Sequence, residues 1–433
     1  MKRNTRARNH RNQKNKKYSD IDHKKVTQTL IPIVVILLLV FISIATFYYF
    51  KNRSSYQNLV DTSRQEIENK EKEDAKNEEL NKNNEEKPSD TTFTMTAVGD
   101  IMCHNTQYKD AYNSETNTYD FSYVFENISS HTKTADICIG NLETTFAGED
   151  KGYSSYPRFN TPDSLAYELK SIGFDVLSTA GNHALDMGYD GLSRTINVLN
   201  DADISHLGTY TSQEEQDNVL IKFVKGLKIA FINYTYGTNG IPVPSDKNYC
   251  VNLNDKELMK KHIDTAKSKN ADIIVACMHW GNEYQTKPNS SQEEMADFLI
   301  KNGVNIVLGT HPHVLQPYKN KTVTLDDGST KDGFVVYSLG NFISDQNTKY
   351  TRDSIILNLT ITKHIDGTVS VDKVEPIPIY MYKDTSVKSQ KMKLIDINKT
   401  LYNYENYLDN SISEDFYNLM KKELNNINSI IAK

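Results

Sequence analysis

Cysteine is scarce in this sequence, with only 4 residues among 433, and this scarcity excludes two classes of architecture. No two of them stand at the short spacing that a disulfide framework or a cysteine-based zinc site requires. Two of them lie inside apolar runs, which indicates buried free thiols. The four are Cys103, Cys138, Cys250 and Cys277.

Basic clusters are missing from the chain after residue 92, and the net charge of the whole sequence is −6. A nucleic-acid surface needs clustered lysine and arginine, so we expect no nucleic-acid partner. The sequence also lacks an internal repeat, which argues against a repeat array.

Charged residues are absent from the run between Leu30 and Phe50, directly after the strongly basic residues 1–28. About 20 residues at helical rise span about 30 Å, which matches a bilayer core. Few basic residues follow the run, so the positive-inside rule places residues 1–28 in the cytoplasm. We predict a transmembrane anchor over residues 29–50 of a single-pass cell-membrane protein with an extracellular main domain. A cleaved signal peptide is the alternative, since Ser43-Ile44-Ala45 resembles a cleavage site.

Apolar residues are almost missing from residues 51–91, where charges of both signs dominate. Such a segment has little to bury, which predicts a charged linker that is either disordered or an exposed helix. As a random coil of ~40 residues it would separate its ends by roughly 35 Å.

From residue 92 onward, apolar runs of strand length alternate with helical patterns. This alternation predicts an α/β domain over residues 92–350 with a mixed sheet system and helices outside. Residues 351–433 add antiparallel strands and a final amphipathic helix that complete the domain or pack on it. The predicted strands are 94–98, 135–139, 175–178, 204–207, 219–224, 228–233, 273–278, 304–308 and 334–339, and the predicted helices are 163–172, 191–200, 255–269, 292–302 and 414–431.

Polar side chains with metal-ligand chemistry follow several of these strands. A glycine followed by an acidic or amide residue is usually a turn, and a lone histidine usually just makes hydrogen bonds. Five placements at successive strand ends are hard to explain as turns, and imidazoles and carboxylates are common ligands of divalent ions. The expected metal ligands are Asp100, Glu143, Asn182, His279, His311 and His313.

His183 follows one of these expected ligands directly and need not bind the ion itself. An imidazole beside such a site can act as a general acid or bind phosphate, with Asp186 orienting its ring. We therefore expect His183 and Asp186 to be catalytic.

Six blocks of the sequence, in this order, resemble the bacterial capsule-synthesis family of the CapA type. The resemblance covers roughly residues 94–345 and implies a role in poly-γ-glutamate capsule synthesis, with other subunits of a polymer synthase and exporter as partners. The family is similar to calcineurin-like metallophosphoesterases, which implies a β-sandwich flanked by helices. The blocks are Gly99-Asp100-Ile101-Met102, Asn141-Leu142-Glu143, Asn182-His183 with Asp186, His279-Trp280-Gly281, His311-Pro312-His313 with Gln316, and Ser338-Leu339-Gly340-Asn341-Phe342.

The same resemblance implies roles for individual residues. Asp100 matches the first metal-binding aspartate of the superfamily and Asn182 its asparagine ligand. Two positions depart from the pattern: Met102 stands where a histidine ligand is expected, and Glu143 replaces a bridging aspartate. The site could therefore hold one or two divalent ions such as zinc, manganese or iron, and His104 could substitute for the missing histidine.

Two functions stay open at this point. One is an accessory protein of capsule polymer synthesis, and the other is a metal-dependent hydrolase, such as a phosphoesterase, that acts on a cell-envelope substrate. We expect His104 and Arg158 to contact the substrate, and an anionic polymer would suit Arg158. The tyrosines around Arg158 could line a groove or simply pack on the surface.

Overall fold

The computed structural model describes residues 89–432, which belong to one compact unit, Pro88–Lys433. The predicted cytoplasmic segment, the anchor over residues 29–50 and nearly all of the linker lie outside the described residues. Among residues 89–432, no helix is both long and apolar enough to cross a bilayer.

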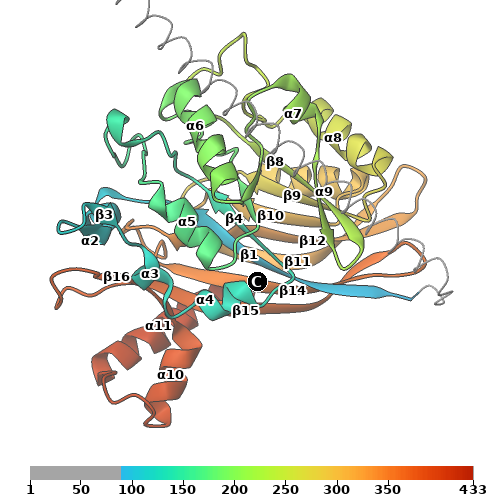
Figure 1. Ribbon diagram of the computed structural model, residues 1–433. Helices are drawn as coiled ribbons and strands as arrows, with labels where there is room; N and C mark the ends of the chain where they lie inside the picture. Colours follow the sequence, from blue (N-terminus) through green and yellow to red (C-terminus); the bar gives the residue numbers. More distant parts are fainter. Residues whose placement is uncertain (1–88, 433) are drawn as a thin grey trace, which may run out of the picture. The chain divides into compact units, whose positions relative to one another are not determined.

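The first of two large sheets is built around β1 (Thr91–Ile101). Its strand order is β16-β15-β14-β1-β4-β5-β6, and the short β13 pairs with the end of β1 (Figure 1). Strands β1, β4, β5 and β6 run parallel to one another, whereas the pairs β1–β14, β14–β15 and β15–β16 are antiparallel. Their bounds are β4 (Ile137–Leu142), β5 (Val176–Ser178), β6 (Ser205–Leu207), β13 (Asn341–Ile343), β14 (Asp353–Lys363), β15 (Val369–Lys383) and β16 (Met392–Asp396).

The second large sheet has the order β11-β12-β10-β9-β8-β7. Its four inner strands, β12, β10, β9 and β8, are parallel, and the two edge strands pair antiparallel to their neighbours. The bounds are β7 (Leu220–Val224), β8 (Leu227–Thr235), β9 (Ile273–His279), β10 (Ile306–Thr310), β11 (Leu315–Thr324) and β12 (Thr330–Leu339).

Strand β9 shows why the two sheets pack face to face with helices outside. All of its side chains are buried, and successive side chains of a strand point to opposite faces. Ile273, Val275 and Cys277 join the core between the sheets, whereas Ile274 and Met278 join a second core beneath helices. A strand with both faces covered must be apolar throughout, which is the pattern that made it visible in the sequence.

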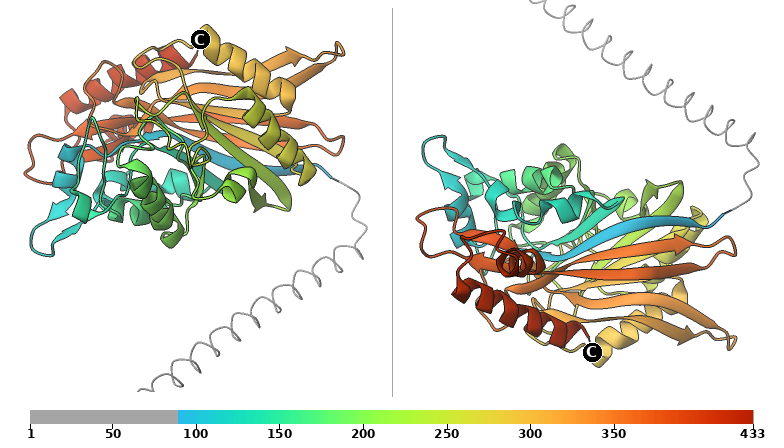
Figure 2. Two further views of the ribbon diagram at one scale, coloured as in Figure 1. Left: turned by 90° about the horizontal axis from the view of Figure 1, so that it is seen from above. Right: turned by 90° about the horizontal axis from the view of Figure 1, so that it is seen from below.

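Helices cover the outer face of each sheet (Figure 2). Helices α8 (Lys256–Ser268) and α9 (Ser290–Asn302) pack on the second sheet through residues such as Ile263 and Leu299. Helices α5 (Ser164–Ser171) and α6 (Gly188–Asp201) contribute Leu169 and Leu199 to the core on the first sheet. The sandwich with helices on both sides confirms the α/β class expected from the sequence.

The remaining short elements lie in the connections. They are α2 (Asn105–Ala111), β2 (Tyr112–Asn113), β3 (Thr118–Tyr119), α3 (Ser122–Phe125), α4 (Ser129–Lys133), η1 (Glu149–Lys151) and α7 (Gln213–Asp217).

The C-terminal elements include α10 (Ile397–Glu405) and α11 (Glu414–Ile431), and α11 has the bounds that its amphipathic pattern predicts. Met420 and Ile427 on α11 join the core between the sheets, and the helix contacts β11, β14 and β15. Figure 2 shows α11 in dark red along the orange strands, away from the teal and green helices. All four cysteines are buried and free, as expected.

Candidate metal centre

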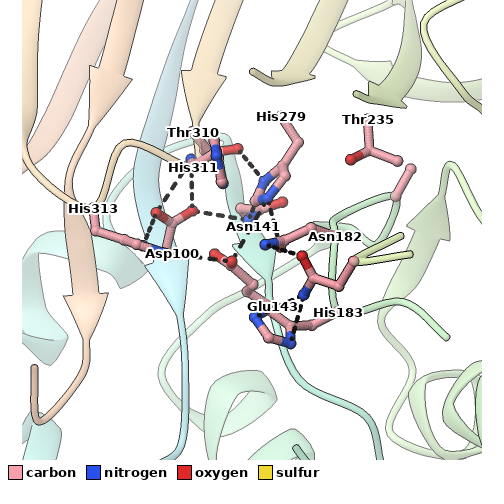
Figure 3. Close-up of polar contacts among 12 residues, drawn as sticks. Asp100, Asn141, Glu143, Asn182, His183, Thr235, His279, Thr310, His311 and His313 are labelled. Carbon is pink, nitrogen blue, oxygen red and sulfur yellow. Dashed lines mark hydrogen bonds and ion pairs between the residues drawn. The ribbon is translucent and has the colours of Figure 1, made fainter. Parts of the chain in front are cut away.

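The carboxyl ends of the parallel strands of both sheets bring the expected ligands together (Figure 3). Asp100 lies near the end of β1 and Glu143 just after β4, whereas His279 is the last residue of β9. His311 and His313 follow β10, and both have positive φ values of 94° and 59°. Since L-residues rarely adopt this conformation, the loop after β10 is held by its surroundings in a strained form.

Asp100 is fully buried and is surrounded by donors from β4 and from the loop after β10. Asn141 Nδ2 donates to Asp100 Oδ1 at 2.9 Å, and His313 Nδ1 lies 3.1 Å from Asp100 Oδ2. The backbone N–H of His311 also points at this carboxylate, at 3.3 and 3.4 Å. These contacts fix the orientation of the Asp100 carboxylate, which can also bind an ion in this position.

Asn182 and His279 direct their side chains at a common point. His279 Nε2 lies 3.0 Å from Asn182 Oδ1, while His279 Nδ1 lies 3.1 Å from the hydroxyl of Thr310. Two ligands of one ion with bonds of about 2.1 Å are about 3.0 to 3.4 Å apart, so the first distance suits shared coordination. The Thr310 hydroxyl contacts Nδ1 on the opposite side of the His279 ring and so sets the orientation of that ring.

Glu143 has a buried carboxylate whose two oxygens both lack a hydrogen-bond partner. Its nearest imidazole nitrogens, His279 Nε2 and His313 Nε2, lie at 3.6 and 3.8 Å, too far for hydrogen bonds. Burial, followed by the charge of Asp100, raises the pKa of Glu143 well above its usual value. An unpaired buried carboxylate costs several kcal/mol, and a divalent cation would offset that cost.

The imidazoles of His279 and His311 are suited to bind a cation, because burial keeps them neutral. Burial, together with the neighbouring His311, lowers the pKa of His279 well below its ordinary value. Burial, followed by His313, lowers the pKa of His311 to about 3, and its buried Nδ1 lacks a hydrogen-bond partner. Neutral imidazole is the form that ligates metals.

Three groups of side chains place one ligand atom each within 4.8 Å of one another. Glu143 belongs to two of them, as a bridging carboxylate would. The donor set and the orphaned oxygens of Glu143 therefore fit a divalent metal site. The groups are Asp100 with Glu143 and His313, Glu143 with His279 and His311, and Glu283 with His311 and His313.

His183 and Asp186 form a separate buried pair beside this cluster. His183 Nδ1 donates to Asp186 Oδ2 at 2.7 Å, and the same oxygen accepts the N–H of Phe159 at 2.6 Å. The Phe159 ring packs edge-on against His183, with the ring centroids 4.8 Å apart. Asn239, which sequence patterns did not single out, lies 3.4 Å from both ring nitrogens of His183.

His104 and Arg158 lie outside the three ligand groups found among residues 89–432. The His104 ring packs nearly perpendicular to that of Phe159, with the centroids 5.3 Å apart, and its Nδ1 accepts the N–H of Asp345 at 3.2 Å. Arg158 is exposed and lines a cavity of about 810 Å³ together with Tyr156 and Asp186.

Glu283, which forms a ligand group with His311 and His313, was not predicted as a metal ligand from the sequence. It follows His279-Trp280-Gly281 by two residues, and a carboxylate so close to a strand-end histidine was the available signal. Two tyrosines also border the site: the Tyr236 ring lies 4.6 Å from that of His311, and the Tyr284 ring lies 6.2 Å from that of His313.

Fold and site together define an α/β sandwich with a His, Glu and Asp cluster suited to a divalent metal ion. A family model described as bacterial capsule synthesis protein PGA_cap matches residues 94–346. The chain belongs to this family, which confirms the resemblance seen in the sequence. A second model, described as Orf76 (Ac76), matches residues 20–86, which lie outside the described residues.

Two relatives carry capsule-related names. The chain is 32% identical over 290 residues to the capsule biosynthesis protein CapA of Bacillus anthracis, covering 65% of this chain and 66% of that protein, slightly under two thirds. It is 29% identical over 323 residues to the PGA biosynthesis protein CapA of Bacillus subtilis, covering 74% of this chain and 80% of that protein.

Solved structures with a partly similar fold include two nucleotidases. The NAD nucleotidase (NadN) of Haemophilus influenzae matches 79% of this chain and 60% of its own, with a TM-score of 0.44 and 12% identity. The 5'-nucleotidase precursor of Thermus thermophilus matches 66% of this chain and 54% of its own, with a TM-score of 0.39 and 17% identity. Similarities this weak say nothing about the chemistry of the site.

Proposed function

We propose that this protein is a membrane-anchored extracellular component of poly-γ-glutamate capsule synthesis and export, with a metal site of the metallophosphoesterase type. Family membership and the names of the two Bacillus relatives support the capsule role. The anchor is proposed from the uncharged run Leu30 to Phe50 and its basic flank. Partners would be the other subunits of a polymer synthase and exporter.

The single observation that carries the metal site is the buried carboxylate of Glu143, whose oxygens have no hydrogen-bond partner and one of which lies 3.6 Å from the neutral imidazole of His279. Two positions share this carboxylate. Asp100 and His313 would hold an ion on one side of it, and His279, His311 and Asn182 on the other. Zinc, manganese and iron all accept this mixture of nitrogen and oxygen donors.

A divalent ion in such a site supplies Lewis acidity and lowers the pKa of water. The chain itself supplies a proton carrier beside the site. Because the Nδ1–H of His183 is committed to Asp186, its Nε2 is the atom that would exchange a proton with a leaving group. The cavity next to this pair, with Arg158 on its wall, would receive an anionic substrate.

A metal-dependent hydrolase that acts on a cell-envelope phosphoester is the second candidate. The His183–Asp186 pair favours it, because a site that only binds a polymer has no need of an oriented proton carrier. An anionic polymer that passes the cavity would use the same Arg158 for binding alone.

Elemental analysis of the purified full-length chain tests the metal site. We expect about two equivalents of a divalent metal in the wild-type chain, as bridged sites hold. Asp100→Asn and His311→Ala should lose metal, whereas His364→Ala, far from the cluster, should retain it. A wild-type chain that holds no metal after exposure to zinc and manganese overturns the proposed site.

Polymer release tests the capsule role in cells. A strain that carries Asp100→Asn in place of the wild-type chain should release less poly-γ-glutamate, whereas the His364→Ala strain should match the wild type. Normal polymer release by a strain without this protein contradicts the capsule role.

A further inference from the structure

The two ion positions around Glu143 are unequal in the number of donors that the protein supplies. The position at His279 and His311 has a fourth donor in Asn182, whose Oδ1 lies 3.0 Å from His279 Nε2. The position at Asp100 and His313 has only three donors, counting Glu143. Divalent ions of this type take four or more ligands from protein and water, so this position has room for a further protein ligand.

Glu283 is a carboxylate placed to supply this further ligand. One of its oxygens is within 4.8 Å of ligand atoms of both His311 and His313. His313 of the donor-poor position is 2% exposed, and both oxygens of the neighbouring Glu143 lack a hydrogen-bond partner, so this buried position holds donors that no protein group satisfies. Glu283 itself is exposed and therefore stands on the solvent side of the cluster.

The loop that carries Glu283 is fixed to the histidine loop, although its side chain is exposed. Tyr284 N–H donates to the carbonyl of Pro312 at 2.8 Å, between the two histidines. Tyr284 adopts a φ of 64°, a strained value that the surrounding contacts must hold. The buried Gln316 donates to the carbonyls of Gln285 and Lys287 at 2.8 and 3.1 Å. The backbone directly after Glu283 is thus tied to the loop that holds the histidines and to β11, which follows it.

We propose that Glu283 is a further ligand of the metal centre, one that completes the donor-poor position shared with His313 from the solvent side. This inference rests on the proposed metal site and extends it to a residue outside the strand-end blocks. A solvent-side carboxylate is also the ligand that an incoming anionic substrate can displace, because it needs no rearrangement of the buried donors.

Cobalt titration of the full-length chain tests the assignment, because the visible absorption of bound Co²⁺ reports its ligands. We expect Glu283→Gln to weaken one of the Co²⁺ equivalents about 10- to 100-fold and to change the absorption of the bound ion. Glu283→Asp, which keeps a shorter carboxylate, should fall between Glu283→Gln and the wild type. Glu294→Gln, an exposed glutamate on α9, is the matched control and should titrate like the wild type.

Identical Co²⁺ binding and absorption in the wild type and Glu283→Gln overturn this inference alone. If Glu283→Gln lowers the affinity for Co²⁺ but leaves the absorption spectrum unchanged, Glu283 acts through its charge. That result overturns its assignment as a ligand. A wild-type chain that binds no Co²⁺ overturns the proposed metal site and this inference together.

Discussion

The side chains of His183 and Asp186 meet at 2.7 Å, and the Asp186 oxygen in this contact also accepts the N–H of Phe159. The carboxylate therefore couples the orientation of the imidazole to the loop that ends at Phe159. The other oxygen of Asp186 is buried without a hydrogen-bond partner, so it can accept a further hydrogen bond at the edge of the cavity.

Replacement of His183 tests its role as a proton carrier. For any phosphoester that the wild-type chain hydrolyses, we expect His183→Ala to lower kcat by about 10²- to 10⁴-fold, the usual contribution of general acid–base catalysis. Metal content should not change, because His183 is absent from the three ligand groups. Steady-state kinetics and elemental analysis on the same preparation separate the two effects.

Asp190→Asn on α6 is the matched control for this experiment, since Asp190 is exposed and lies close by in the sequence. Hydrolysis by His183→Ala at the wild-type rate would contradict the proposed role of the imidazole.

Arg158 is expected to bind the anionic substrate at the cavity wall. Because the guanidinium is exposed, its contact with a carboxylate polymer is partly screened by water and salt. Arg158→Ala should therefore weaken binding of poly-γ-glutamate by about three- to tenfold at low salt, and by less at high salt. Fluorescence anisotropy with labelled polymer measures both values.

Lys151→Ala removes an exposed positive charge from the same connection between β4 and α5 and should change the affinity less. Equal affinities for Arg158→Ala and the wild type would end the hypothesis that Arg158 contacts the polymer.

Gly99 allows the end of β1 to approach β13 closely. A Cβ atom there would lie 1.8 Å from the carbonyl oxygen of Gly340, which accepts the N–H of Asp100 at 2.9 Å. Gly99→Ala should destabilise the fold by about 3 kcal/mol and shift Asp100, because the obstacle is backbone and cannot rotate away. A lower Tm together with reduced metal binding is the expected outcome.

Gly237→Ala is the control, since a Cβ atom at that position meets no atom within 4 Å. A Tm for Gly99→Ala equal to that of Gly237→Ala would contradict the close approach of the two backbones.

Asp353 at the start of β14 is buried, and both of its oxygens lack a hydrogen-bond partner. Burial and the charge of Glu423 on α11 raise the pKa of Asp353 to about 8, although Lys422 partly opposes the shift. Between pH 4 and 8 the folded chain holds a proton that the unfolded chain releases. The free energy of unfolding should therefore fall as the pH rises through this range.

Asp353→Asn should remove this dependence, because the amide cannot lose a proton. We expect the free energy of unfolding of the variant, relative to that of the wild type, to be about 1–3 kcal/mol higher at pH 8 than at pH 5. Denaturant unfolding at both pH values gives the difference, and Asp201→Asn, at an exposed site on α6, serves as the control. A wild-type stability that does not fall between pH 5 and 8 relative to Asp353→Asn would show that Asp353 is ionised in the fold.

The sequence alone determined the elements whose residues are buried in a regular pattern. Strand β9 and helix α11 are visible because their periodicity records the burial of their own side chains. Strand-end residues such as Asp100 and His279 were also visible, because polar groups directly after apolar runs mark the end of a sheet. Edge strand β11 and the short helices α2 to α4 were not predicted, since partly exposed elements carry weak periodicity.

Only the tertiary structure decided which of these residues meet. His313 and Asp100 are 213 positions apart in the chain, and their contact depends on the packing of two sheets. The same holds for Glu283, whose position beside His311 and His313 depends on contacts such as the one between Tyr284 and Pro312. Local patterns record whether a side chain is buried, whereas proximity between distant segments is set by how the layers pack, which no local pattern encodes.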